Sequence, residues 1–331
     1  MNTKSKSKIF SIGLAVASVA LCGCKTPVTE SFEATRPWHD TGASYEKLVY
    51  DVNIYDVRDG SEEDKRKVIA QGGLVYELTE QTRVDGSINY SRLRSDFSVT
   101  YNDEASEAER GLTDRITNSV EFQSDSLITS YMQKSVELAD REGATNNSYS
   151  IEADYFGTHK ATLTMTGKDD AQPQTMTIPN NTYRDNEMMY YLARATAINK
   201  GATTNFNMTN LFDSFIKGEF TVYGMTASAG SETATVDIGD WVKDHGVEAV
   251  TDEEQNTSYP VPCYYVTIMI NEAKHGPPHY VYYSEKPFTD GGKEHKKIPV
   301  KIFYYEYYGS KASKMTEFVL TSCSFENTAN D

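Results

Sequence analysis

The sequence has no hydrophobic run long enough to cross a bilayer as a helix, which takes about 20 residues. Its longest apolar stretch, Ile9 to Leu21, has about 13 residues, almost all apolar or small, and follows three lysines among the first eight residues. A positive start with a short apolar core is typical of a secretory signal rather than of a transmembrane helix. We therefore predict that the chain is exported from the cytoplasm.

The end of this stretch, Leu21-Cys22-Gly23-Cys24, resembles the lipobox of bacterial lipoproteins. A lipobox has an aliphatic residue at −3, a small residue at −1 and then the lipid-bearing cysteine, so its register selects Cys24. Cleavage before Cys22 would instead place the bulky Leu21 at −1. Acyl chains such as palmitate, two or more of them, would anchor the protein stably. Residues 1–23 are thus predicted to be a lipoprotein signal peptide; an ordinary cleaved signal with a chance cysteine is the alternative.

Residues 24–44 are rich in Thr, Pro, Ser and Glu and lack a hydrophobic period, which predicts a lipidated tether. The membrane is then a partner through the lipid anchor. The predicted location is the bacterial cell envelope, on the extracytoplasmic side, at the outer face of the cytoplasmic membrane or at the outer membrane.

Cysteines are few, with four in the chain. If Cys22 is removed and Cys24 carries lipid, Cys263 and Cys323 remain. An even pair in an exported protein predicts a disulfide between them, and two buried thiols are the alternative.

Basic residues are also scarce, since 32 Lys and Arg stand against 48 Asp and Glu. Removal of a signal with three lysines and no acid takes the net charge from −16 to −19. Such a charge disfavours binding of nucleic acid or of anionic lipid as the main activity.

Motifs of common catalytic sites are missing: the sequence has no G-x-S-x-G, no phosphate-binding glycine loop and no zincin helix. Ser214 and Lys217 match S-x-x-K without its partner motif, and we predict a strand edge there. His275 and His279 flank Gly-Pro-Pro, which predicts a solvated hairpin loop rather than a metal site. We therefore predict no catalytic residues, no metal and no cofactor.

Short segments of alternating apolar and polar residues run through most of the chain, for example 47–57 and 72–84. Tyrosine is frequent, with 23 residues, and suits half-buried strands. The regular spacing predicts a mainly β protein with an antiparallel sheet in a single domain over 45–325, followed by a frayed tail at 326–331.

The alternation breaks once, over Asn181 to Gly201, where apolar residues recur at helical spacing. This pattern predicts one amphipathic helix near 183–199. Its apolar face either fills the core or lines a cleft for an apolar ligand. The residues of this face are Met188, Tyr191, Leu192, Ala195 and Ile198.

Two motifs carry a family resemblance: IPNNTYRDNEMMYYLARA around the predicted helix, with Tyr190 and Arg194 on it, and YVYYSEK followed by IPVKI. They resemble the unclosed β-barrel of bacterial envelope proteins, which includes the Lol-type lipoprotein-localisation carriers and a related periplasmic family of unknown function. The resemblance implies a curved antiparallel sheet, an unclosed half-barrel, wrapped around the helix.

The resemblance also implies the leading hypothesis for function: a non-catalytic lipoprotein that binds a lipid or a lipidated protein between sheet and helix. The first alternative is a surface adhesion or glycan-binding module that uses the tyrosine-rich strands around Tyr280 and Tyr304. The second is a hydrolase with a dispersed carboxylate site.

Overall fold

The computed structural model describes residues 30, 45–60, 62, 66–82, 89–139, 148–165, 172–196, 198–270, 277–308 and 311–326. The predicted signal peptide, Cys24, most of the predicted tether and the tail beyond Glu326 lie outside these residues.

Strands with alternating buried and exposed side chains make up most of the described chain, as β1 shows with Leu48, Tyr50, Val52 and Ile54 buried on one face. In chain order the strands are β1 (Tyr45–Asp56), β2 (Lys67–Thr82), β3 (Asn89–Tyr101), β4 (Thr113–Gln123), β5 (Thr129–Glu137), β6 (Tyr149–Asp154), β7 (Lys160–Met165), β8 (Gln174–Thr177), β9 (Thr203–Thr209), β10 (Val222–Asp237), β11 (Val250–Thr251), β12 (Thr257–Ser258), β13 (Pro260–Ile270), β14 (His279–Ser284), β15 (Phe288–Asp290), β16 (Lys293–His295), β17 (Pro299–Tyr308) and β18 (Lys311–Glu326).

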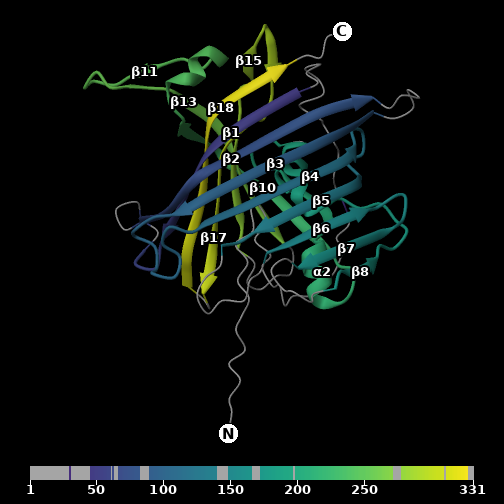
Figure 1. The fold of residues 1–331 in the computed structure, drawn as a ribbon. Coiled ribbons are helices and arrows are strands. Elements are labelled where there is room, and N and C mark those ends of the chain that lie inside the picture. The colour runs from purple at the N-terminus through teal and green to yellow at the C-terminus, as the bar shows by residue number, and fades with distance from the viewer. Residues whose placement is uncertain are drawn as a thin grey trace.

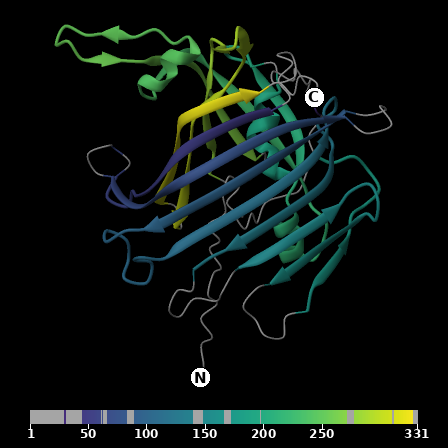
Figure 2. The same ribbon diagram turned by 45° about the horizontal axis from the view of Figure 1, so that its top comes forward.

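Fourteen of these strands form one antiparallel sheet in the order β8-β7-β6-β5-β4-β3-β2-β1-β18-β17-β14-β13-β10-β9. The first and last described strands, β1 and β18, pair with each other near the middle of this sheet. Its edges, β8 and β9, each pair with one neighbour among the described residues, so the sheet is not closed. Figures 1 and 2 show it curving around the helical segments from the middle of the chain. The predicted mainly β, unclosed antiparallel architecture is confirmed. Two small sheets, β11–β12 and β15–β16, stand beside it.

The predicted helix is present but shorter than 183–199. It consists of a 3₁₀ turn, η2 (Asn186–Met188), and α1 (Met189–Arg194). The Asp185 side chain starts it by accepting a hydrogen bond from the Glu187 amide, 3.0 Å away. All nine residues are buried, because the curved sheet encloses the helix on more than one side.

A second helix, α2 (Leu211–Lys217), stands where the sequence pattern predicted the beginning of a strand. Asn210 caps its first turn, and Gly218 ends it in the left-handed conformation at φ 73°. A further 3₁₀ turn is η3 (Asp240–His245). Among the described residues, no helix is both long and apolar enough to span a membrane.

Candidate functional site

The first turn of the buried helix carries an ion pair that joins it to the inner face of the sheet. Lys134 of β5 donates from Nζ to Oε1 of Glu187 at 2.6 Å, and Asn118 of β4 donates from Nδ2 to Oε2 at 2.9 Å. The Lys134 and Glu187 side chains are only 4% and 2% exposed. Burial opposes the lysine charge, but the charge and hydrogen bond of Glu187, together with the nearby Tyr149 and Asp185, outweigh it and raise the pKa of Lys134. A buried pair held this closely fixes the position of the helix on the sheet.

Asp185 adds a second carboxylate beside this pair. Its Oδ2 accepts from the Tyr155 hydroxyl at 2.7 Å, and its backbone N–H donates to Oγ1 of Thr129 at 2.9 Å. Burial, together with the charge of Glu187, raises the pKa of Asp185 to about 7. The shift favours the protonated form of Asp185, and a protonated Asp185 leaves the Lys134–Glu187 pair electrically balanced.

A row of polar side chains crosses the inner face of the sheet beside Glu187. Tyr76 lies opposite Ser95, Ser95 opposite Asn118, and Asn118 opposite Lys134, on four consecutive strands. Three buried atoms in this row, Tyr76 Oη, Ser95 Oγ and Asn118 Oδ1, have no hydrogen-bond partner among the described residues. Buried polar atoms are almost always paired in native proteins, so such a row offers binding positions for ordered water or a polar group of a ligand.

The last turn of the helix is fixed by a different contact. Arg194 forms a bidentate pair with Glu46 of β1, with Nη1–Oε1 and Nη2–Oε2 distances of 2.5 Å and 2.9 Å. Arg194 Nη2 also donates to the Lys296 carbonyl at 3.0 Å, and the Tyr191 hydroxyl donates to Glu46 at 3.1 Å. Both charged side chains are buried, which makes this contact a structural clamp between helix and sheet.

Tyr190 and Arg194, the helix residues of the family-like motif, are thus both structural. The Tyr190 hydroxyl lies 2.9 Å from Nδ1 of His279, and its carbonyl accepts from the Tyr283 hydroxyl at 2.6 Å. His279 is buried on β14, which corrects the predicted solvated loop; His275 lies outside the described residues. Burial lowers the pKa of His279 to about 4, so the ring is neutral at pH 7.

The predicted cleft face of the helix is packed rather than open in the described structure. All five of its residues belong to the hydrophobic core, and none is more than 5% exposed. This is the alternative in which the apolar face fills the core. The five residues are Met188, Tyr191, Leu192, Ala195 and Ile198.

Cys263 and Cys323 are both free cysteines. Cys263 is on β13 and Cys323 on β18, with β14 and β17 between them in the sheet. Three strand spacings amount to about 14 Å, whereas a disulfide needs Cα atoms within about 7 Å. The fold therefore does not support the predicted disulfide, because the strand order separates the two cysteines.

The S-x-x-K residues lie on α2, which corrects the predicted strand edge. The Ser214 hydroxyl donates to the Asn210 carbonyl at 2.7 Å, and Lys217 Nζ contacts Asp213 and Tyr223 at 2.7 Å and 2.6 Å. In these bonds Ser214 and Lys217 do not contact each other. Both side chains hold α2 together or join it to β10.

The outer face of β13, β14 and β17 carries a continuous group of half-buried rings, called here the aromatic platform. Tyr265 and Tyr280 stack with ring centroids 5.7 Å apart, and Tyr280 and Phe303 stack at 4.6 Å. Tyr282 and Tyr305 complete the group. Cross-strand aromatic pairs stabilise a sheet, and their free faces can also contact a ligand.

A polar cavity of about 680 Å³ lies over strands β2 to β6. The centre of its lining is a cross-strand row of Arg94, Ser119 and Gln133. The residues before and after each of them along the strand are buried, so the row lies on the outer face of the sheet. Arg92 and Glu121 form an ion pair at its side. The cavity is polar, unlike the apolar cleft predicted beside the helix.

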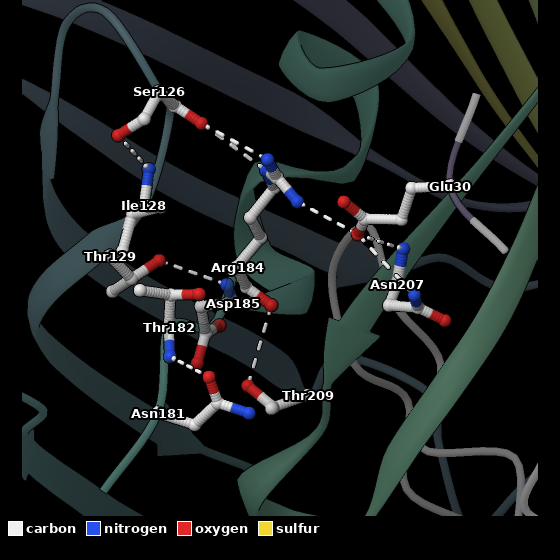
Figure 3. A network of polar contacts seen from close by, with 10 residues as sticks. All are labelled: Glu30, Ser126, Ile128, Thr129, Asn181, Thr182, Arg184, Asp185, Asn207 and Thr209. Atoms are coloured by element: carbon white, nitrogen blue, oxygen red, sulfur yellow. Dashed lines mark hydrogen bonds and ion pairs between the residues drawn. The ribbon is translucent and has the colours of Figure 1, made fainter. Parts of the chain in front are cut away.

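A network of polar contacts holds the open side of the half-barrel (Figure 3). The Arg184 guanidinium donates to the Ser126 carbonyl at 3.2 Å and to Glu30 Oε1 at 2.9 Å, and the same carboxylate oxygen accepts from the Asn207 amide at 3.1 Å. Glu30 belongs to the predicted tether, so at least this residue of it contacts the β domain.

No family model and no curated protein matches the chain. One similar solved structure is a β-barrel-like protein of the domain of unknown function DUF1849 from Brucella abortus. It shares 12% identity, covers 86% of this chain and 98% of its own, and has a TM-score of 0.46. Another, from Vibrio parahaemolyticus, is a domain named for outer membrane lipoprotein sorting, with 10% identity, 89% and 91% coverage and a TM-score of 0.20. Both likenesses concern the fold alone.

Proposed function

We propose that this protein is a non-catalytic lipoprotein of the bacterial cell envelope that binds a lipid or a lipidated partner between the curved sheet and the buried helix. The observation that supports the proposal is the row of unpaired polar atoms on Tyr76, Ser95 and Asn118. It lies next to the helix and the buried Lys134–Glu187 pair, within a core of apolar side chains, so the interior combines apolar walls with a few polar groups, as ligand sites do.

The walls of this interior are adaptable. Five methionines belong to the core cluster, among them Met188 and Met189 on the helical segment. Methionine is flexible and fills irregular spaces, so side chains that are packed in the ligand-free protein can rearrange around an acyl chain. A packed core is then the empty state of the site.

Two observations support a non-catalytic role. Asp185 and Glu187 are buried and hydrogen-bonded to Tyr155, Asn118 and Lys134, so neither carboxylate is exposed to a substrate in solution. The serine and lysine of S-x-x-K are used within α2, as described above. A hydrolase with a dispersed site would need a carboxylate that is both buried and open to a cleft.

The binding proposal is tested on the whole mature chain with Cys24→Ser, which removes the lipid anchor. Native mass spectrometry with palmitate and with a lysophospholipid should detect a one-to-one complex, and the ligand should raise Tm. Ser95→Ala should weaken lysophospholipid binding several-fold, whereas Ser98→Ala on the opposite face of β3 should not. Absence of any complex, or equal affinity of the two serine variants, would contradict the proposal.

The aromatic platform favours a second candidate, a glycan-binding or adhesion module. Flat, half-exposed tyrosine rings such as Tyr265 and Tyr280 match the apolar faces of sugars, and their hydroxyls can bind sugar hydroxyls. A glycan array with the Cys24→Ser chain tests this candidate. Binding that Tyr280→Ala abolishes would support it, and an array without any retained glycan would reject it.

A further inference from the structure

Glu30 connects the segment after the predicted lipidation site to one defined place on the β domain. Its carboxylate pairs with Arg184 at 2.9 Å and accepts the backbone N–H of Asn207 at 3.1 Å. The Arg184 side chain is 14% exposed and that of Glu30 35%, so the pair is partly shielded from water on the arginine side. Figure 3 shows Glu30 facing both partners.

The contact lies at the seam of the half-barrel, which is defined here as the region between the two sheet edges, β8 and β9. Asn207 is on β9, one edge. Arg184 lies seven residues after Thr177, the last residue of β8, and its carbonyl accepts the Thr209 amide of β9 at 2.8 Å. The Glu30 carboxylate therefore contacts one edge, β9, and the segment that leads from the other edge, β8, to the buried helix.

Helix α2 belongs to the same region. It directly follows β9, and its Phe212 stacks on Tyr149 of β6 with ring centroids 4.2 Å apart. At its other end Lys217 donates to the Tyr223 hydroxyl at 2.6 Å, and Tyr223 lies opposite Met208, the neighbour of Asn207. The helix thus spans the seam, and it presents Ile216, a large apolar side chain that is 56% exposed.

We propose that Glu30 turns the seam of the half-barrel toward the membrane surface, so that α2 and Ile216 face the lipid. The inference rests on the proposed lipid anchor at Cys24. Glu30 is the sixth residue after Cys24, and a fully extended chain of six residues spans at most about 21 Å. Without the Glu30 contact, the first fixed residue would be Tyr45, 21 positions after Cys24, and the extended chain between them would reach up to about 70 Å and would set no orientation.

The partner is therefore the bilayer that holds the anchor. The short link brings the seam within reach of the headgroups, and the exposed Ile216 is the side chain suited to contact the interface. An acyl ligand of the interior would then pass between bilayer and protein at the seam, beside α2, without crossing water.

The test uses the lipidated full chain in phosphatidylcholine vesicles that contain headgroup-spin-labelled lipid as a quencher. Cys263→Ser and Cys323→Ser remove competing thiols, and a fluorophore is attached through Ile216→Cys or, as a control, through Val250→Cys. Val250 is 52% exposed and lies on β11, at the opposite end of the molecule from α2 in Figures 1 and 2. Quenching should be several-fold stronger at position 216 than at position 250.

Glu30→Ala should remove this difference, whereas Glu253→Ala, a change of an exposed glutamate in the β11–β12 loop, should leave it. Equal quenching at the two positions in the unaltered chain, or a difference that survives Glu30→Ala, would overturn the inference. A chain that does not sediment with the vesicles would overturn the lipid anchor, and the inference with it. Lipid binding by the interior is measured separately on the Cys24→Ser chain, so its failure is distinguishable.

Discussion

The two ends of the buried helix balance their charges in different ways. At the C-terminal end, Arg194 meets Glu46 in a one-to-one bidentate pair. At the N-terminal end, two carboxylates, Asp185 and Glu187, stand beside a single ammonium group, Lys134. Both ends are buried, so neither can rely on water to disperse an excess charge.

The difference assigns separate roles to the two ends. The Arg194–Glu46 end is neutral without any proton uptake, and it acts as a fixed clamp. The other end becomes neutral only when a carboxyl binds a proton, and burial and the charge of Glu187 favour that proton on Asp185 by raising its pKa to about 7. The unpaired polar row also lies at this end. Sensitivity to pH and to ligand is therefore expected at the N-terminal end of the helix.

The largest expected effect comes from breaking the clamp. Arg194→Met should lower the free energy of unfolding by about 3–5 kcal/mol at pH 7, because it leaves the Glu46 carboxylate buried without an opposite charge. Urea denaturation of the Cys24→Ser chain measures this loss.

The double variant Glu46→Gln with Arg194→Met is the control for the clamp. It removes both charges at once, so it should cost less than the single Arg194→Met change. If the double variant is as unstable as the sum of the two single variants, the pair is not coupled and the contact is not a clamp.

Local sequence patterns were sufficient to predict the strands and the presence of the buried helix, but not α2 and not which elements pack together. Alternation predicted the strands, and the helical spacing of Met188, Tyr191 and Leu192 predicted the buried helix. The clamp joins residues 148 positions apart, and the Lys134–Glu187 pair joins residues 53 positions apart. No local pattern indicates which strand, distant in the sequence, packs against a helix.

Some signals in the sequence were nevertheless informative. Lys134 occupies an inward position of β5, between the buried Met132 and Val136, so its charge had to be paired inside. Asn210 and Gly218 are the cap residues of a short helix, and together they could have indicated α2. The separation of Cys263 and Cys323 depends on strand order, which spacing alone does not determine.

Asp185→Asn tests the difference between the two ends of the helix, because it removes the carboxyl that binds a proton at the N-terminal end. The folded pKa of Asp185, about 7, lies above its ordinary value of 3.8, so its contribution to stability is complete below pH 4 and is lost as pH rises through 7. That loss amounts to about 4 kcal/mol. In Asp185→Asn this decline is removed, so the urea midpoints at pH 4.5, 6 and 8 should rise with pH because of the opposite slope of His279, whereas in the unaltered chain the two slopes nearly cancel below pH 6.5. An unchanged pH profile would mean that Asp185 stays ionised in the folded protein.

His279, which contacts the middle of the helix through Tyr190, should produce the opposite slope. Burial lowers its folded pKa to about 4 from 6.5, so its contribution is complete above pH 6.5 and is lost as pH falls through 4. The amount is about 3 kcal/mol, which nearly offsets the Asp185 effect between pH 4 and 6.5. His279→Gln should therefore reveal a stability that falls with rising pH, while the Asp185→Asn, His279→Gln double variant should be flat. A double variant that keeps either slope would show that another group titrates here.

The smallest expected effect is a gain in stability rather than a loss, and it concerns the polar row at the N-terminal end of the helix. The Ser95 hydroxyl is buried without a partner among the described residues, so Ser95→Ala should raise the stability of the ligand-free protein by up to about 1 kcal/mol. Ser91 is the matched control: it is also buried on the same face of β3, but its hydroxyl bonds that of Ser124 at 2.8 Å. Ser91→Ala should therefore lower the stability by about 1 kcal/mol. If Ser95→Ala is destabilising to the same extent, its hydroxyl already has a bound water, and the row is satisfied before any ligand arrives.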